Sequence, residues 1–413
     1  MGQTDTPTHD HLWDPSDPDY RANPHTFYDR LRTEAPAYLA RSGQVVLTRY
    51  ADVFEVLRSN DVSRDLDANA ILDEADEVAV FRRRRRQGGA KSILNLDPPD
   101  HTRLRRLVSK AFTPKAIERL RPRIEQMVDE VLDRAEATGT IELIDDLAFP
   151  VPFLVISELL DMPTERADEL RTWSGALTQS LEPTASLADL EASGDAIALL
   201  VPYLIEIIEQ RRSDPGDDLL SALLAVEDDG DTLSYEELIS FVVLLYVAGH
   251  ETTVNLIGNG VLALLRNPDQ LDKWRHDPTL DTGAVDELLR FDGPVQHTVR
   301  VAMTPMHFTG ANGETITVEP GHVMLTVLGA ANHDPEVFPD PHSLILDRPN
   351  AGKHTSFSAG VHYCLGASLA KLEAGVAITR LIRRFDHIEL AGEPHWRDRV
   401  TIRGVDHLPL IVS

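Results

Sequence analysis

The sequence of 413 residues contains a single cysteine, Cys364, and therefore cannot form an intrachain disulfide. This excludes a secreted scaffold cross-linked by disulfides and favours a reducing compartment such as the cytoplasm. Basic residues are also few, with 40 Lys and Arg against 67 Asp and Glu, which gives a formal net charge of -27. A surface of this charge repels polyanions, so we expect neither nucleic acid nor an anionic membrane as a partner.

Long hydrophobic runs without charge are absent as well. The first thirty residues are polar and contain several prolines, so they do not resemble a signal peptide. The most apolar stretch, 234–267, carries Glu251 near its centre, and a carboxylate in the middle of a membrane span is costly. We therefore expect no membrane anchor. No repeat or low-complexity linker divides the chain, which predicts one domain over residues 1–413.

The hydrophobic pattern predicts a mainly α protein with a small β region, an α+β fold. Between about 98 and 290, apolar residues recur at helical spacing. Short β-type runs follow (HTVRVA, ETITV and HVMLTVL), and the turn signal Asn312-Gly313 suits a type I′ hairpin. A last strong helix is expected from about 366 to 384, directly after Cys364.

Residues 234–267 predict one long helix. Ser234 and Glu237 have the spacing of a capping box, and the pattern ends before Pro268. At 1.5 Å per residue the helix would be about 50 Å long, enough to cross a domain. Its centre, AGHETT at 248–253, is polar between two apolar halves. A tolerated polar kink in a core helix is the plain explanation, but charge is seldom buried without a purpose.

The most informative segment is FSAGVHYCLGASLA, residues 357–370. A lone cysteine is usually an inert apolar residue, but Cys364 lies between two glycines and just before a helix N-terminus. Free N–H groups and the helix dipole favour a thiolate there, as an iron ligand requires. Gly360 and Gly366 allow the backbone to turn sharply and to approach a flat macrocycle. Phe357 is placed to shield the sulfur from water.

This segment resembles the haem-binding loop of the cytochrome P-450 family, in which Phe is followed by Gly at the fourth, His at the sixth, Cys at the eighth and Gly at the tenth position. One departure is Ser358, where the family most often has glycine. The resemblance covers the chain from about Trp13 onward. It implies the cytochrome P-450 fold with a long central helix over the haem. It also implies haem b (iron protoporphyrin IX) held by the Cys364 thiolate, with O2 as co-substrate.

By this resemblance, the polar centre of the long helix corresponds to the acid–alcohol pair of the family. Glu251 would relay protons, Thr252 would hydrogen-bond dioxygen, and Ala248 would leave room over the iron. A thiolate ligand favours cleavage of the O–O bond. The implied activity is that of a haem-thiolate monooxygenase, which inserts one oxygen atom into a lipophilic small molecule by C–H hydroxylation or epoxidation.

The resemblance also gives roles to charged residues whose spacing alone says little. Helical pairs such as Glu287 and Arg290 are common on protein surfaces. In the family, this pair and a later arginine form a structural triad that supports the haem loop: Glu287, Arg290 and Arg348. Propionate binding, which suits charge-assisted hydrogen bonds, falls to four basic residues: His101, Arg105, Arg300 and His362.

Candidate pocket residues by the same resemblance are mostly apolar, which suggests a lipophilic substrate. They are Ile93, Leu94, Trp173, Leu177, Leu244, Val247, Ala248, Val295, Thr298 and Ile402. The basic run at 82–86 borders substrate entry in the family, and either a solvated surface or an anionic substrate group could explain it.

The chain is too short for a fused flavin reductase, so electrons are expected from a separate ferredoxin and its NAD(P)H-dependent ferredoxin reductase. An acidic ferredoxin would be repelled by most of the surface. Arg103, Arg106 and Lys110 are candidates for a local positive patch that would bind it, together with Lys353.

Three other functions fit the sequence less well. A haem-binding sensor without turnover would have no need of Glu251 and Thr252. A peroxide-driven hydroxylase typically has other residues in place of this pair. A metallohydrolase is suggested by His250-Glu251, but Val254 stands where the zinc pattern His-Glu-x-x-His needs its second histidine.

Overall fold

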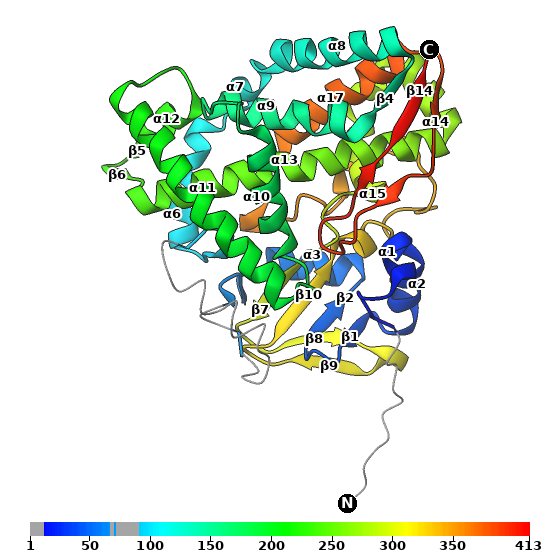
Figure 1. The fold of residues 1–413 in the computed structure, drawn as a ribbon. Coiled ribbons are helices and arrows are strands. Elements are labelled where there is room, and N and C mark those ends of the chain that lie inside the picture. Colours follow the sequence, from blue (N-terminus) through cyan, green and yellow to red (C-terminus); the bar gives the residue numbers. More distant parts are fainter. Residues whose placement is uncertain (1–11, 67–69, 72–90) are drawn as a thin grey trace, which may run out of the picture.

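The structure is a computed structural model, and it describes residues 12–66, 70–71 and 91–413. The basic run at 82–86 lies outside the described residues. Helices dominate, and a smaller β region lies on one side of them (Figure 1). The predicted mainly α fold with a small β region is therefore confirmed.

The helical body extends from residue 100 to 292, and the last long helix of the chain returns to it (Figure 1). Its longer helices are α6 (Asp100–Ala111), α8 (Arg121–Thr138), α9 (Pro150–Leu159), α10 (Ala167–Gln179), α11 (Leu187–Ser213), α12 (Leu219–Ala225), α13 (Tyr235–Arg266), α14 (Pro268–His276), α15 (Ala284–Asp292) and α17 (Ala367–Arg384).

Helix α13 begins and ends where the sequence predicts. Ser234 caps it, and both hydrogen bonds of the capping box with Glu237 are present. By length and apolarity α13 could cross a membrane, but most of its apolar residues are buried against other helices of the protein. Glu251 is also buried within this helix. It is therefore the core helix of the helical body.

The main sheet has five strands in the order β1-β2-β10-β7-β3. Strands β7 (His297–Ala302) and β10 (Val323–Val327) coincide with two predicted runs. The other three strands come from the N-terminal part of the chain and were not predicted: β1 (Ala37–Leu39), β2 (Val45–Leu47) and β3 (Val62–Ser63). Strand β10 pairs in parallel with β2 and antiparallel with β7, so the sheet joins distant parts of the sequence.

A separate hairpin joins β8 (Met306–Thr309) to β9 (Thr315–Val318). Asn312 and Gly313 have φ values of 54° and 80°, the left-handed backbone that a type I′ turn requires. Short strands β5 (Glu227–Asp228) and β6 (Asp231–Thr232) form another hairpin just before α13. Strand β14 (Pro409–Val412) pairs with β4 (Thr140–Glu142) and β11 (Ile388–Leu390), which brings the C-terminal residues back to the helical body.

Helices α13 and α17 pack closely because Gly260 presents no side chain at their contact. A Cβ atom there would lie 3.1 Å from Ile378 of α17. Within the same interface Glu373 of α17 is almost fully buried, and its carboxyl hydrogen-bonds Thr253 of α13. The Oε2 atom of Glu373 has no hydrogen-bond partner among the described residues. Burial raises the pKa of this carboxyl to about 8 from 4.5, despite the opposing hydrogen bond.

Glu373 makes folding pH-dependent in a defined direction. Because its folded-state pKa lies above the unfolded value, the folded protein holds an extra proton between these two values, and stability falls as pH rises through this interval. Glu373→Gln removes this loss. We expect the stability advantage of the variant over wild type to increase by about 3 kcal/mol between pH 6 and pH 8.5 in urea unfolding.

The exposed carboxylate Glu389 provides the control: the difference in stability between Glu389→Gln and wild type should be the same at pH 6 and at pH 8.5. Stability curves of wild type and Glu373→Gln that remain parallel over this range would contradict the raised pKa.

Candidate active site

Cys364 lies in the loop before α17, whose N-terminal cap is Gly366. The Cys364 N–H donates to the Phe357 carbonyl at 3.0 Å, which closes the loop. The Cys364 side chain is accessible, yet enough protein surrounds it for desolvation to raise the pKa of its thiol. The Gly366 N–H and the Arg105 guanidinium oppose that rise. The N–H at the helix terminus thus favours the thiolate, as the sequence predicts, but burial outweighs it, and ligation to a metal would have to complete the deprotonation.

Two residues of the loop have left-handed backbone. Ser358 has φ 62° and Gly360 has φ 69°. A Cβ atom at Gly360 would lie 2.6 Å from the carbonyl oxygen of Leu57 in α3 (Tyr50–Arg58). Gly360 is thus required by its own backbone and by packing on α3. A Cβ atom at Gly366 would have no neighbour within 4 Å, so neither packing nor backbone strain requires glycine at this position among the described residues.

Basic residues gather around His362 in the same loop. The ring of His101 on α6 lies 4.2 Å from the His362 ring, and Arg105, Arg300 and Arg64 also act on it. Burial and then these cations lower the pKa of His362 to about 3, and burial and Arg64 lower that of Arg300 to about 9.

Such a cluster favours an anionic ligand. Asp97 is the carboxylate that opposes the shifts at His101 and Arg300, and the buried Nδ1 of His101 has no partner among the described residues. The two propionates of haem would supply negative charge to these donors. A single thiol and a cationic cluster in the same loop region together fit haem. Arg64 was not predicted, because it follows a two-residue strand and belongs to no motif.

One face of α13 is accessible at the middle of an otherwise buried helix. Ala248 is exposed, and Leu244, Val247 and Thr252 are half-buried. Val247, Ala248 and Thr252 follow Leu244 by three, four and eight residues, so they lie on one side of the helix. The Thr252 hydroxyl donates to the Ala248 carbonyl at 3.1 Å, which leaves its oxygen able to accept a hydrogen bond.

Glu251 points into a different environment. Its carboxylate accepts hydrogen bonds from Arg397 and, at 3.0 Å, from Arg399. Burial alone would raise the pKa of Glu251, but Arg397, His250 and Arg399 outweigh burial and lower it. Neither arginine was predicted, because each lies about 150 residues from Glu251 in sequence and belongs to no motif. His250 is structural: its Nδ1 contacts the Tyr246 carbonyl at 2.7 Å and its Nε2 the Ser174 hydroxyl at 3.1 Å.

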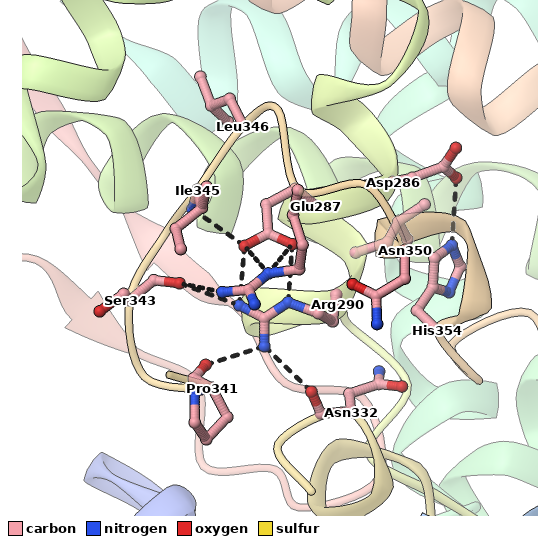
Figure 2. Close-up of polar contacts among 12 residues, drawn as sticks. Asp286, Glu287, Arg290, Asn332, Pro341, Ser343, Ile345, Leu346, Asn350 and His354 are labelled. Carbon is pink, nitrogen blue, oxygen red and sulfur yellow. Dashed lines mark hydrogen bonds and ion pairs between the residues drawn. The ribbon is translucent and has the colours of Figure 1, made fainter. Parts of the chain in front are cut away.

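Glu287, Arg290 and Arg348 lie together in the interior, as Figure 2 shows for the first two and their partners. The Glu287 carboxylate accepts two hydrogen bonds from Arg290, at 2.7 and 2.8 Å, and two from Arg348 at 3.1 Å. Both guanidinium groups also donate to carbonyls of the segment 339–343. The charges are thereby paired and their donors satisfied, as burial demands.

A hydrogen-bonded path leads from this triad to the Cys364 loop. Arg290 donates to the Asn332 carbonyl at 3.0 Å. The Asn332 side chain accepts from the Thr355 N–H at 2.7 Å and donates to the Ser356 hydroxyl at 2.8 Å. Thr355 and Ser356 directly precede the loop, so the triad fixes where the loop begins.

The predicted pocket residues have different surroundings. Val295 and Ile402 are paired through a β-bridge. Trp173 is buried against Tyr203 of α11, with Arg166 over both rings, so it faces a neighbouring helix rather than an open site. The Thr298 hydroxyl accepts hydrogen bonds from Arg64 at 3.0 Å and Arg300 at 3.3 Å, and thus helps to position the cationic cluster.

The remaining pocket candidates are described by their exposure. Leu94 is exposed, Leu177 is half-buried and Ile93 is buried.

A loop that presents one thiol beside a cationic cluster, in a helical protein crossed by a long polar-centred helix, defines a haem-thiolate protein. The comparisons with known proteins agree. The family model described as Cytochrome P-450 matches residues 181–398. The chain belongs to the cytochrome P-450 family and is a monooxygenase, which in this family binds haem b through a cysteine thiolate and uses O2. In this chain that thiolate can come only from Cys364.

Relatives match over nearly the whole chain. Cytochrome P-450 107B1 of Saccharopolyspora erythraea is 43% identical and covers 94% of both chains. The vitamin D(3) 25-hydroxylase of Pseudonocardia autotrophica is 38% identical over 95% of this chain and 94% of its own. The crystal structure of P450BioI, bound to an acyl carrier protein that carries hexadec-9Z-enoic acid, has a TM-score of 0.86 and 34% identity, and covers 97% of this chain and 100% of its own.

Ser358 is a strained position that a substitution can relieve. A side chain with φ 62° costs about 1–2 kcal/mol relative to right-handed backbone, and the buried Ser358 hydroxyl has no partner among the described residues. We expect Ser358→Gly to raise the free energy of unfolding by about 1 kcal/mol, because glycine adopts this backbone freely. Thermal denaturation followed at the Soret band would measure it. Ser358→Ala, which keeps the strain, should gain less, and equal gains in both variants would contradict this explanation.

Proposed function

We propose that this chain is a ferredoxin-dependent monooxygenase that inserts one atom of O2 into a lipophilic small molecule, by C–H hydroxylation or epoxidation. We place it in the cytoplasm, with residues 1–413 acting as one domain. The observation that carries the proposal is the middle of α13, where Thr252 lies on an accessible face and Glu251 is buried beside it with two arginines. A haem-binding sensor has no use for such a pair.

The residues that would hold haem come from four parts of the chain. Cys364 would supply the axial sulfur, with Phe357, Gly360 and Gly366 shaping its loop. Bound haem would supply the chemistry of O2 reduction and oxygen-atom transfer, which a thiolate ligand favours. The propionates would be bound by the predicted basic residues His101, Arg105, Arg300 and His362. We add Arg64, which acts on His362 together with them. The triad Glu287, Arg290 and Arg348 would keep the loop in place through Asn332.

Proton delivery would depend on Glu251 and Thr252. Its arginine partners keep Glu251 ionised, so the carboxylate can accept a proton from solvent and pass it on. The Thr252 oxygen, already oriented by its bond to the Ala248 carbonyl, would accept and hand over a proton at the open face of the helix. Exposed Ala248 would leave room for O2 above this face.

The substrate class follows from the apolar residues on the same face and nearby. Leu244 and Val247 flank Ala248 on α13, and Val295 and Ile402 form a paired wall. Apolar pockets with few polar groups bind lipophilic ligands. The name of one relative, vitamin D(3) 25-hydroxylase, supports hydroxylation of a large lipophile. We also assign Leu94 and Leu177 to the pocket, whereas Trp173 and Thr298 are better explained by the contacts described above.

The proposed ferredoxin site needs one correction. Arg103 pairs with Asp231 and Glu237, and Arg106 and Lys110 both pair with Asp228. The β5–β6 hairpin thus neutralises much of the positive charge that the sequence of α6 suggests. An acidic ferredoxin that docks near α6 would meet these carboxylates as well as the cations.

Thr252→Ala tests the proposal directly. We expect the variant to retain haem and its carbon-monoxide spectrum, but to form about tenfold less product per NADPH and to release hydrogen peroxide instead, because proton delivery by a side chain contributes at least this much. The substrate would be taken from a Soret-shift screen of steroids, fatty acids, terpenes and macrolides. Thr252→Ser keeps a hydroxyl and should restore most of the product.

Two results would overturn the proposal. One is fully coupled turnover by Thr252→Ala. The other is product formation with hydrogen peroxide alone that equals or exceeds formation with ferredoxin, reductase and NADPH, which would favour the peroxide-driven alternative.

Asp228 offers a test of the electron donor. If an acidic [2Fe–2S] ferredoxin docks near α6, Asp228→Asn should raise the rate of haem reduction about threefold at low ionic strength, because it frees Arg106 and Lys110, and salt should abolish the gain. Stopped-flow reduction under carbon monoxide measures this rate. Asp133→Asn is the control, because it likewise removes one carboxylate from an ion pair, here with Arg384 of α17. A rate unaffected by Asp228→Asn and by Arg106→Glu would exclude this docking site.

A further inference from the structure

A short segment near the C-terminus connects two parts of the site. Residues 397–403, here termed the C-terminal strap, carry Arg397 and Arg399 at one end and Ile402 at the other. Arg397 and Arg399 bind Glu251, and Ile402 is bridged to Val295. The position of this strap therefore sets both the partners of Glu251 and one wall of the pocket.

Glu182 holds the middle of the strap. It lies just beyond α10 and is completely buried. One carboxylate oxygen accepts the N–H of Val400 at 2.8 Å and that of Thr401 at 2.9 Å, and the other accepts the N–H of Ile402 at 3.4 Å. A carboxylate can accept several hydrogen bonds and donates none, which matches three consecutive backbone donors.

The opposite edge of the strap is bound to the segment before β7. The Gln296 N–H donates to the Thr401 carbonyl at 3.0 Å, and the Arg403 N–H donates to the Pro294 carbonyl at 2.8 Å. The strap thus runs between a carboxylate on one side and backbone groups on the other. Without Glu182, the N–H groups of Val400, Thr401 and Ile402 would lose this acceptor, and the strap would lose its central anchor.

Helix α10 takes part in the same unit. Arg399 donates to the Thr178 hydroxyl at 2.9 Å and to the Gly175 carbonyl at 3.2 Å, as well as to Glu251. Glu182 follows this helix by three residues. The C-terminal end of α10 therefore fixes the arginine end of the strap through Thr178 and its centre through Glu182.

We propose that Glu182 is a positioning residue of this enzyme: by accepting the N–H groups of residues 400–402, it places Arg399 against Glu251 and Ile402 in the pocket wall. The inference rests on the proposed function, in which Glu251 relays protons and Ile402 contacts substrate. It adds that one buried carboxylate, which binds the strap backbone, sets the position of both the Glu251 partners and Ile402.

The proposal is tested by Glu182→Gln in the haem-loaded protein, with two measurements that need no turnover. Glutamine has one acceptor oxygen and places an N–H₂ donor against the backbone donors, so the strap should shift. We expect binding of 4-phenylimidazole, measured by its Soret shift, to weaken about fivefold, equivalent to the loss of about one good contact. The carboxylate infrared band of Glu251, isolated by difference from a Glu251→Gln derivative, should move towards that of a hydrated carboxylate.

Thr178→Val separates the two ends of the strap. It removes one anchor of Arg399, so it should shift the Glu251 band but change the affinity for 4-phenylimidazole less than about twofold. Glu182→Asp, which keeps an acceptor-only group, should lie between wild type and Glu182→Gln. These variants also keep the test decisive if Glu182→Gln folds poorly.

Glu142→Gln is a matched control, because Glu142 likewise accepts an N–H of the C-terminal chain, from Leu408, which lies outside the strap and contacts neither Glu251 nor Ile402 through a hydrogen bond among the described residues. It should change neither measurement. The proposal is overturned if Glu182→Gln alters both measurements no more than Glu142→Gln does. A shifted Glu251 band combined with unchanged coupling in Glu251→Gln would instead reject the proton relay and leave the positioning role intact.

Discussion

The burial of one carboxylate at the centre of α13 determines much of what surrounds it. A charged group in the interior is unstable unless it is paired and hydrogen-bonded. Glu251 meets this requirement through Arg397 and Arg399, which a returning C-terminal segment delivers to the middle of the longest helix. That segment must in turn be fixed by Glu182 and by residues 294–296. The polar centre of α13 thus imposes order on chain far from it in sequence.

The buried ionisable groups described above are stabilised in three different ways. Glu251 and Glu287 are each paired with two arginines. Glu373 lies at the α13–α17 contact with no cation against it among the residues that the structure describes, and its raised pKa keeps it largely protonated near neutral pH. The cluster around His362 is the opposite case, an excess of positive charge that favours two bound carboxylates.

The sequence predicts features whose signals are local. The capping box of Ser234 and Glu237 gives the start of α13, Asn312-Gly313 gives the hairpin turn, and the Cys364 loop gives the family. Features that depend on contacts between distant residues were not predictable in the same way. Arg64, Arg397 and Glu182 belong to no motif, and strands β1 to β3 have only two or three residues each. The contact of Trp173 with Tyr203 was likewise not predictable, because a sequence does not show which side of α10 faces α11.

The main sheet has a consequence for how the protein is made. Strand β2 ends at Leu47 but pairs with β10, which begins at Val323. On the ribosome, at about 5–20 residues per second, roughly 15–55 s pass between synthesis of these two strands. During that time the N-terminal strands have apolar faces and unsatisfied edges without their partners. The helices between residues 100 and 292 are synthesised in this interval and can begin to pack, so the sheet is expected to close late and its N-terminal strands to need protection from aggregation until then.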